Sequence, residues 1–206
     1  GLHKRGHEVH IIAPSLGYKD GIEPDEGTTI HRLASYPVPL AKNDHRLAFS
    51  PQRKINKIMN EFKPDVVHIH NPFPIGKAVQ KYCLKHNIPM IATNHWLPEN
   101  ITTFMAKFRF LNSLQFLVDM NWKFIIKFHN KCQFVTSPTQ TAVNLMLEQD
   151  LTAPNRPVSN GVDTDIFHPE NNADKLKNRL NLPNKPTALY AGRLSGEKHR
   201  SEEHTS

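Results

Sequence analysis

The chain has 206 residues and a net charge of +7. This length suits one large domain, or one domain and part of another, and the positive charge favours nucleotide phosphates or an anionic membrane surface as partners. No apolar run approaches the length that crosses a bilayer, and no signal peptide is visible, although one could precede the chain. The two cysteines, Cys83 and Cys132, lack metal-ligand spacing, which indicates reduced, buried thiols in a cytoplasmic protein.

Strand and helix signals alternate along the first 150 residues. The chain opens on a helix end with Gly6 as its C-cap. The strands that we predict are Glu8 to Ala13, Thr29 to Leu33, Val66 to Ile69, Met90 to Thr93 and Gln133 to Thr136. The helices are Pro51 to Phe62, Ile75 to His86, Thr102 to Phe128 and Thr139 to Glu148. Residues 16–27 and 36–50 are rich in Gly, Pro and Asp and are predicted to be loops.

Several of these strands are continuous apolar runs, as expected for strands covered on both faces. Together with the alternation of strands and helices, they predict an α/β fold with a Rossmann-like, doubly wound parallel sheet in residues 1–150. Loops at the carboxyl edge of such a sheet commonly shape a ligand crevice.

The sequence changes character after Asp150. Residues 151–170, punctuated by proline and Asn160-Gly161, are predicted to link two domains. A short helix from Ala173 to Leu180 and a strand from Thr187 to Ala191 would begin a second Rossmann-like domain in residues 171–199. Residues 200–206 resemble the translation of a sequencing-library adapter, so we interpret them as a non-native tail, with a genuine polar tail as the alternative.

Five segments, in this order and spacing, resemble the retaining glycosyltransferases of the GT-B fold, of the group 1 or family 4 type. They are Leu2 to Val9, Pro64-Asp65-Val66-Val67-His68-Ile69-His70, Thr93-Asn94-His95, Ser159-Asn160-Gly161-Val162-Asp163 and the Gly192-Arg193 turn. This family uses nucleotide sugars to glycosylate lipids and glycans. The resemblance implies a fragment truncated at both ends and inactive alone: a strand and a glycine-rich loop would precede it, and most of the nucleotide-sugar-binding domain would follow His199.

Polar residues follow the strand that ends at Thr93, and the strand ends of an open sheet are where ligands bind. The resemblance places His95 near the acceptor and the reacting bond, where a neutral imidazole could orient a hydroxyl or donate to developing charge. A loop histidine that caps the next helix is the alternative. Asn94, Glu99 and Asn100 are further candidates for the acceptor-side crevice, and Asn100 is also a helix-capping candidate.

Two histidines lie two residues apart in the preceding strand, so their side chains share one face. His68 and His70 could in principle hold a zinc ion together with His95, but no cysteine or carboxylate has suitable spacing. We therefore predict no metal. We assign His70 to the acceptor-side crevice and His68 to the core.

The turn after the last strand carries Arg193 and Lys198 beside Gly192. Cations and backbone N–H groups in such a turn suit an anionic ligand, although a solvated basic turn would look the same. The resemblance implies that both cations bind the diphosphate of a UDP- or GDP-sugar and stabilise charge on it as the sugar leaves, without a metal or other cofactor. It also places Asn160 and Gly161 in an interdomain turn, where Gly161 would adopt a backbone conformation closed to other residues; an ordinary Asn-Gly turn is the alternative.

The segment from Phe104 to Lys131 combines aromatic and basic residues at helical spacing. It could lie in an anionic membrane interface, which would make the protein peripheral at the inner face of the membrane, or pack in the core with a solvated basic face. No nucleic-acid recognition motif appears.

The resemblance implies a hexosyltransferase that transfers a sugar from a nucleotide sugar to a lipid or glycan acceptor with retention of configuration. Two alternatives remain open: a GT-B-type nucleotide-sugar epimerase, and a non-catalytic sugar- or nucleotide-binding module.

Overall fold

The structure is a computed structural model that describes residues 1–38, 46–96, 114–182 and 185. Four parallel strands form its larger sheet, in the order β6-β7-β8-β9. They are β6 (Val67–Ile69), β7 (Met90–Thr93), β8 (Phe134–Ser137) and β9 (Asn155–Pro157). Their parallel pairing requires crossover connections, and helices supply them.

A three-stranded sheet and a short hairpin form the amino-terminal part. In the three-stranded sheet, β1 (His10–Pro14) pairs in parallel with β3 (Thr28–Leu33), and β2 (Gly21–Asp25) pairs with β3 in the antiparallel direction. The hairpin joins β4 (Ser35–Pro37) to β5 (Arg46–Ala48). A 3-10 turn, η1 (His3–Arg5), precedes these strands, and Gly6 ends it in the left-handed conformation, as the sequence predicts.

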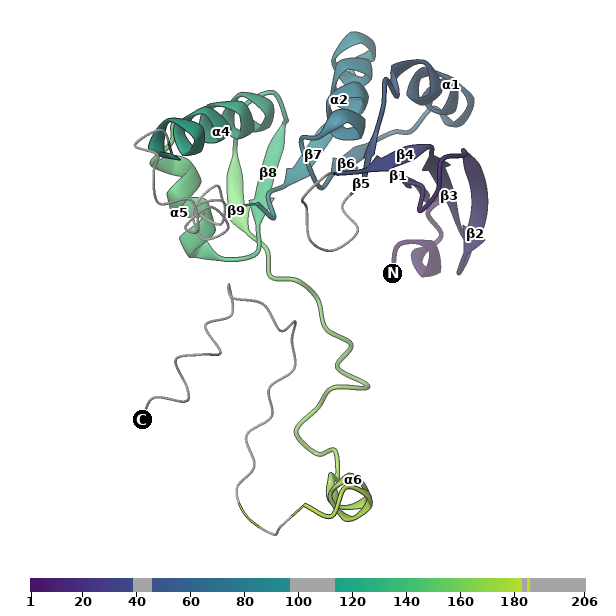
Figure 1. Cartoon of the computed structure of the whole chain (residues 1–206), viewed down its shortest axis with the longest axis vertical. Coiled ribbons are helices and arrows are strands. Elements are labelled where there is room, and N and C mark those ends of the chain that lie inside the picture. The colour runs from purple at the N-terminus through teal and green to yellow at the C-terminus, as the bar shows by residue number, and fades with distance from the viewer. Residues whose placement is uncertain (39–45, 97–113, 183–184, 186–206) are drawn as a thin grey trace.

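Helices cover the strands on one side. Figure 1 shows α1 (Gln52–Phe62), α2 (Pro74–His86) and α4 (Leu114–His129) along this side, whereas α5 (Gln140–Leu147) packs beside β8 and β9. Thr139 caps α5, because its Oγ1 accepts a hydrogen bond from the N–H of Ala142 at 3.1 Å. The predicted α/β fold with a parallel sheet is confirmed.

The core lies between these helices and the sheets. Its fully buried members include Ile55 of α1, Cys83 of α2 and Met90 and Ala92 of β7. Cys83 and Cys132 are buried and unpaired with each other, as predicted, and burial raises the pKa of Cys83 to about 11. A thiol with so high a pKa stays protonated and inert at neutral pH.

Most predicted strands and helices agree with the structure to within two residues, and β7 has the predicted bounds. The predicted loops at 16–27 and 36–50 are wrong in part, because β2 and β5 lie within them and β4 overlaps the start of the second. All five residues of β2 are exposed, and its glycine, proline and aspartate are tolerated because it is an edge strand. A tight turn at Glu26 and Gly27, both with positive φ, joins β2 to β3.

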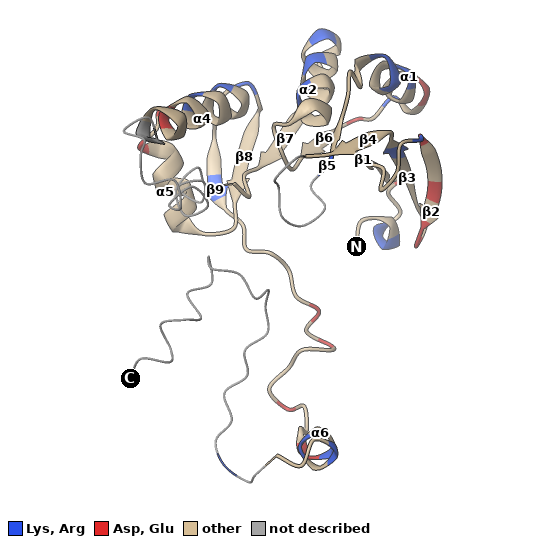
Figure 2. Cartoon of the chain, viewed as in Figure 1, with Lys and Arg blue, Asp and Glu red and all other residues tan. Residues whose placement is uncertain are grey.

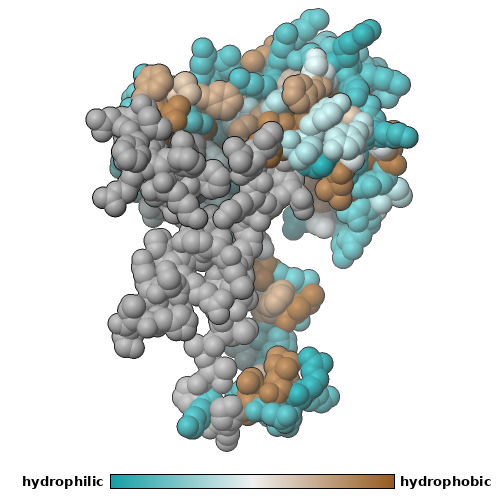
Figure 3. Space-filling view, in the orientation of Figure 1, coloured by the Kyte–Doolittle hydropathy of each residue, from teal (hydrophilic) through white to brown (hydrophobic). Residues whose placement is uncertain are grey.

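The chain leaves the larger sheet after β9 and runs to α6 (Asp174–Arg179), which Figure 1 places apart from the sheets. The predicted helix from Ala173 to Leu180 corresponds to α6, which has no buried residue. Several apolar side chains in this segment are exposed, among them Val162, Ile166, Phe167 and Leu180, and Figure 3 shows brown, apolar surface there. The predicted strand at 187–191 lies outside the described residues, as does the first part of the helix predicted from Thr102.

Among the described residues, no helix combines the length and the apolar character that spanning a bilayer requires.

Candidate functional site

Three histidines gather at the carboxyl ends of two neighbouring strands. His68 lies in β6, His70 follows β6 directly, and His95 follows β7 by two residues. Because β6 and β7 pair in parallel, their carboxyl ends meet at one edge of the sheet. The structure therefore brings His70 and His95 together, as the sequence predicts.

The three imidazoles form a row with short contacts. His70 Nδ1 lies 3.2 Å from His95 Nε2, and the ring centres of His68 and His70 are 4.2 Å apart. His68 Nε2 lies 2.7 Å from Thr93 Oγ1, which in turn lies 2.7 Å from Thr136 Oγ1. A line of hydrogen-bonding groups thus crosses β6, β7 and β8 on one face of the sheet.

The charge state of this row follows from its surroundings. Partial desolvation of the ring lowers the pKa of His68, although much of the side chain is exposed, and the neighbouring His70 and His95 lower it further. Partial desolvation likewise lowers the pKa of His70, followed by the effect of His95. Both rings are therefore neutral at pH 7 and act as hydrogen-bonding groups rather than as cations.

The prediction that His68 belongs to the core is wrong. Its ring is held by Thr93, but the residue is exposed, whereas Ile69 on the opposite face of β6 is buried. His68 and His70 are exposed on this face, whereas Thr93 beside them is buried. His68 thus lies beside His70 at the site.

Asn94 points in the opposite direction from its neighbour His95. The residue is 2% exposed; its Nδ2 donates to Met146 Sδ, and its carbonyl oxygen accepts a hydrogen bond from Ser137 Oγ at 3.0 Å. Its N–H also donates to the carbonyl oxygen of Thr136 at 2.8 Å. Asn94 was predicted to line the acceptor-side crevice, but its side-chain amide is buried, and the residue instead holds the turn in which His95 lies.

Thr93 and Thr136 are polar residues of this site that the sequence reasoning missed. They lie opposite each other in the paired strands β7 and β8, and both are on the histidine face. Strand alternation could have found Thr93, because it is two residues from His95 and successive side chains alternate between faces.

Exposed aromatic rings form a second cluster, around the hairpin of β4 and β5. Tyr36 contacts both Tyr18 and Phe49, with ring centres 5.3 Å and 5.4 Å apart, and the Arg46 guanidinium lies over the Tyr18 ring. Ser35 fixes Arg46 through two hydrogen bonds. These rings come from both segments that were predicted to be crevice loops.

The other predicted site residues divide into two groups. Glu99, Asn100, Arg193 and Lys198 lie outside the described residues. Asn160 and Gly161 are exposed in the segment after β9. The backbone expectation for Gly161 is wrong: its φ is not positive, and an added Cβ would meet no heavy atom within 4 Å.

No group of three or more His, Cys, Asp or Glu side chains in the described ranges has an arrangement that could hold a metal ion. The three histidines are joined by ring contacts and hydrogen bonds instead.

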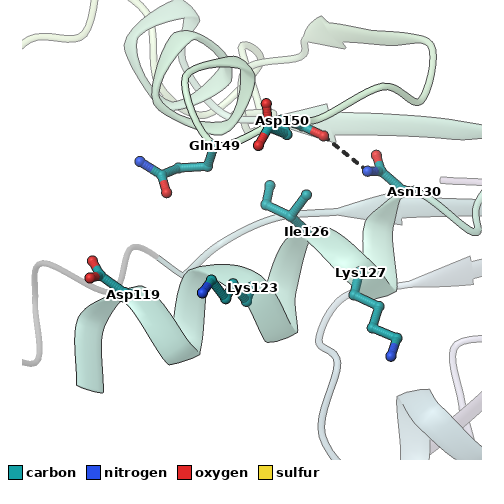
Figure 4. Close-up of a pocket in the computed structure, with 7 residues that line it drawn as sticks. All are labelled: Asp119, Lys123, Ile126, Lys127, Asn130, Gln149 and Asp150. Atoms are coloured by element: carbon teal, nitrogen blue, oxygen red, sulfur yellow. Dashed lines mark hydrogen bonds between the residues drawn. The ribbon is translucent and has the colours of Figure 1, made fainter. Parts of the chain in front are cut away.

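A separate hollow of about 410 Å³ lies between α4 and the end of α5 (Figure 4). Its lining is Asp119, Lys123, Ile126, Lys127, Asn130, Gln149 and Asp150. Asn130 Nδ2 closes one end by donating to the carbonyl oxygen of Asp150 at 3.0 Å. The predicted site residues are not part of this lining, and its two lysines and two aspartates give it no net charge.

The described half of the predicted aromatic, basic segment is α4 and the turn after it. Val118, Trp122 and Ile125 are buried on one side of the helix, whereas Lys123 and Lys127 are exposed. Figure 2 shows Lys and Arg along the outer sides of α2 and α4. Core packing with a basic face, one of the two predicted alternatives, is therefore observed for this half; binding to a membrane stays a prediction.

Comparisons with known proteins give a consistent result. Residues 1–166 match the family model described as Glycosyltransferase Family 4. The chain is 26% identical over 199 residues to a GDP-mannose-dependent alpha-mannosyltransferase of Corynebacterium glutamicum, covering 96% of this chain and 46% of the relative. It is 25% identical over 204 residues to an alpha-monoglucosyldiacylglycerol synthase of Acholeplasma laidlawii, covering 96% of this chain and 50% of the relative.

A solved structure supports the fold. Sucrose-phosphate synthase from Thermosynechococcus elongatus superposes with a TM-score of 0.62 at 17% identity, covering 96% of this chain and 48% of that one. At this identity the likeness concerns the fold alone. The chain spans about half the length of the curated relatives it matches.

Proposed function

We propose that this chain, which belongs to glycosyltransferase family 4, forms the acceptor side of an enzyme that transfers a hexose from a nucleotide sugar to a lipid or glycan. The observation that carries the proposal is the contact between His70 and His95 at the carboxyl ends of two paired parallel strands. Ligands of open α/β sheets bind at this edge. Residues 1–150 would form the acceptor-side domain, and residues 151–170 would link it to a nucleotide-sugar-binding domain that begins at residue 171.

The names of the relatives support the two substrates. The mannosyltransferase is named as GDP-mannose-dependent, which supports a nucleotide sugar as donor. The other relative is named after a glucosylated diacylglycerol, which supports a lipid acceptor. A glycan acceptor and a UDP-sugar donor remain within the proposal.

In this mechanism His95 acts near the reacting bond. Its imidazole would orient the acceptor hydroxyl toward the sugar, and proton transfer by such a group typically contributes about 10²-fold to 10⁴-fold in rate. Arg193 and Lys198 would contact the diphosphate and stabilise the charge that builds on it as the sugar leaves. Transfer with retention of configuration is part of the proposal on the ground of the family resemblance.

The first experiment measures sugar transfer by a full-length protein that contains this chain. GDP-mannose and UDP-glucose would be offered separately with a diacylglycerol acceptor, and His95→Ala compared with the parent. We expect kcat to fall by about a hundredfold. The control is His86→Ala, because His86 is exposed on α2 and its ring stacks on Tyr82, away from the histidine row. Unchanged turnover in His95→Ala would contradict the role of His95.

The donor side is tested by Arg193→Ala and Lys198→Ala in the same protein. Both should lower kcat more than they raise the KM of the nucleotide sugar, because the charge on the diphosphate is greatest in the transition state. Lys175→Ala, in the exposed helix α6, is the control. Equal losses in all three variants would argue against a specific diphosphate contact.

The membrane proposal rests on the exposed side of α4. Phe116 and Met120 are exposed one turn apart, and Lys123 and Lys127 continue the same side of the helix. Vesicles of anionic lipid should bind the chain more tightly than neutral vesicles, with the difference lost at high salt. Lys123→Glu with Lys127→Glu should abolish the difference, whereas Lys81→Glu with Lys85→Glu on α2 should not.

A further inference from the structure

We propose that His70 is a positioning residue: it accepts a hydrogen bond from His95 Nε2–H and thereby leaves His95 Nδ1 as the nitrogen that is free for the substrate. The inference rests on the proposed function for its consequence in catalysis. The hydrogen bond itself can be tested without any assay of sugar transfer.

The geometry is that of an edge-to-edge pair. The ring planes of His70 and His95 differ by 16°, and the ring centres are 5.5 Å apart. The two nitrogens are 3.2 Å apart. The distance between the ring centres exceeds the distance between the nitrogens by about the width of one imidazole ring, which is half a ring width for each histidine. The nitrogens therefore lie close to the line that joins the ring centres. Their in-plane hydrogen and lone pair point along this line, as a hydrogen bond requires.

The Nε2–H tautomer is the more stable neutral form of imidazole in water, and it sets the direction of this hydrogen bond. In that tautomer His95 carries a hydrogen on Nε2, the atom that faces His70. His70 in the same tautomer has a lone pair on Nδ1, the atom that faces His95. Partial burial lowers the pKa of His70, which keeps this ring neutral at pH 7.

Neighbouring residues hold both His70 and His95 in place. The His70 ring lies against the ring of His68, which is held by Thr93 and through it by Thr136. The turn that carries His95 is fixed from both sides, because the N–H of Asn94 donates to β8 and the N–H of Trp96 donates to Asn94 Oδ1 at 3.3 Å. A site supported in this way loses little orientational freedom when substrate binds.

The consequence is a defined direction for the chemistry of His95. With Nε2–H engaged by His70, only Nδ1 can accept a hydrogen bond from an acceptor hydroxyl. If Nδ1 takes that proton, the ring becomes an imidazolium whose second N–H is already satisfied. A third group that orients a catalytic base in this manner is a recurrent arrangement in enzymes, and here a neutral imidazole would fill that role.

The test is long-range proton–nitrogen NMR of the 206-residue chain labelled with ¹⁵N-histidine, which reports the tautomer of each ring. We expect His95 to be the Nε2–H tautomer at pH 7.5. His70→Phe keeps a ring but removes the nitrogens, and it should give a mixture of tautomers at His95. His70→Asn places an amide oxygen near the position of Nδ1 and should restore the parent tautomer. His86→Asn is the matched control and should leave the His95 signals unchanged.

Two outcomes would overturn the inference. One is an Nδ1–H tautomer at His95 in the parent chain, which would make His70 the donor. The other is a His95 tautomer that is the same in His70→Phe and in the parent. Neither outcome depends on whether His95 takes part in sugar transfer, so the failure of this inference is distinguishable from the failure of the proposed function.

A kinetic measurement on the full-length protein separates positioning from folding. His70→Phe should lower kcat by about tenfold to a hundredfold with little change in the KM of the acceptor, because a misplaced catalytic group costs rate rather than binding. His70→Asn should recover most of the loss. A purely structural role would lower the amount of folded protein in both variants and would give no such recovery.

Discussion

Strand β7 of the four-stranded sheet and strand β2 of the three-stranded sheet are stabilised in opposite ways. In the larger sheet, Met90 and Ala92 of β7 are completely buried, and Thr93 and Thr136 carry hydroxyl groups on the same face as His68. In the three-stranded sheet, every residue of β2 is exposed, and its link to β3 includes an ion pair between Glu23 and Arg32. A site that must hold two imidazoles in register lies on the sheet that is fixed by packing.

The charged groups follow the same division. Figure 2 shows acidic residues on β2. The four strands of the larger sheet contain a single charged residue, Arg156 of β9. Exposed charges in water contribute little to stability, while burial of apolar side chains contributes most of it. The comparison therefore predicts large effects of substitutions at the buried positions of β7 and small ones in β2.

The largest expected effect is from Met90→Ala. Met90 is 0% exposed in the centre of the core, and truncation of a buried methionine costs about 2–5 kcal/mol of the free energy of unfolding. Ile22→Ala, in β2, is the control: Ile22 is 73% exposed, and its truncation should change stability by about 0.5 kcal/mol or less. Urea unfolding of both variants measures the difference, and similar losses would refute the contrast between the two sheets.

Gly76→Ala should have the next largest effect on the free energy of unfolding. Gly76 lies near the start of α2, and an added Cβ would come within 1.9 Å of the backbone oxygen of Asn71, just after β6. Ala normally stabilises a helix relative to Gly by about 1 kcal/mol, but here the backbone would have to move, at a cost of about 1–3 kcal/mol. Gly21→Ala in β2 is the control, since no heavy atom lies within 4 Å of its added Cβ.

The Gly76→Ala variant can also be examined by the NMR measurement of the His95 tautomer. Asn71 follows His70 directly, so a shift of the 71–76 segment would also disturb the pair of His70 and His95. The His95 tautomer should therefore change in Gly76→Ala and not in Gly21→Ala. A Gly76→Ala variant as stable as the parent would show that this segment yields easily.

The third contrast is in the response to pH. Burial lowers the pKa of His129, against a smaller raising effect of its hydrogen bond to the carbonyl oxygen of Ile125. Burial and then His10 lower the pKa of His31, against a raising effect of Glu61. A depressed pKa means that the unfolded chain, with a histidine pKa near 6.5, binds more protons than the folded protein just below that pH. The free energy of unfolding therefore decreases as the pH falls from 7.5 toward the folded pKa.

Substitutions distinguish the contributions of His129 and His31 to the pH dependence of stability. His129→Asn keeps a donor near the position of Nδ1, and His31→Gln keeps a polar group near that of Nε2, but neither new residue titrates. Unfolding curves between pH 5 and 7.5 should become less pH-dependent in both variants, and more so in His129→Asn, because His129 is 1% exposed and His31 is 9% exposed. The reverse order would mean that the three-stranded sheet governs the response to acid.

Sequence reasoning succeeded where burial decides the structure. Strand β7 was predicted with its observed bounds, because Met90 to Thr93 is a short apolar run between polar segments. Strand β2 could not be predicted, because its residues favour turns and its extended form depends on pairing with β3. Strand β9 is a polar three-residue segment that is defined only by its pairing with β8.

The functional site, too, could be predicted from the sequence only in part. The rule that ligands bind at strand ends predicted the meeting of His70 and His95, and the parallel pairing of β6 and β7 explains it. The sequence could have predicted the orientation of Asn94. Asn94 lies two residues after Ala92 and four after Met90, so strand alternation places all three side chains on the buried side. The hydrogen bond between the histidines depends on ring rotation, which no sequence pattern specifies.

The smallest expected effect concerns the ion pair in the three-stranded sheet. Glu23 Oε1 lies 2.6 Å from Arg32 Nη2 and 2.7 Å from its Nε, but both side chains are substantially exposed. Glu23→Gln should therefore cost only about 0.5 kcal/mol, and 1 M salt should remove most of the difference. Glu61→Gln is the control, because its ion pair with Lys57 is longer, at 3.9 Å, and should cost even less. A loss in Glu23→Gln that approached the loss in Met90→Ala would mean that this sheet also depends on a specific contact.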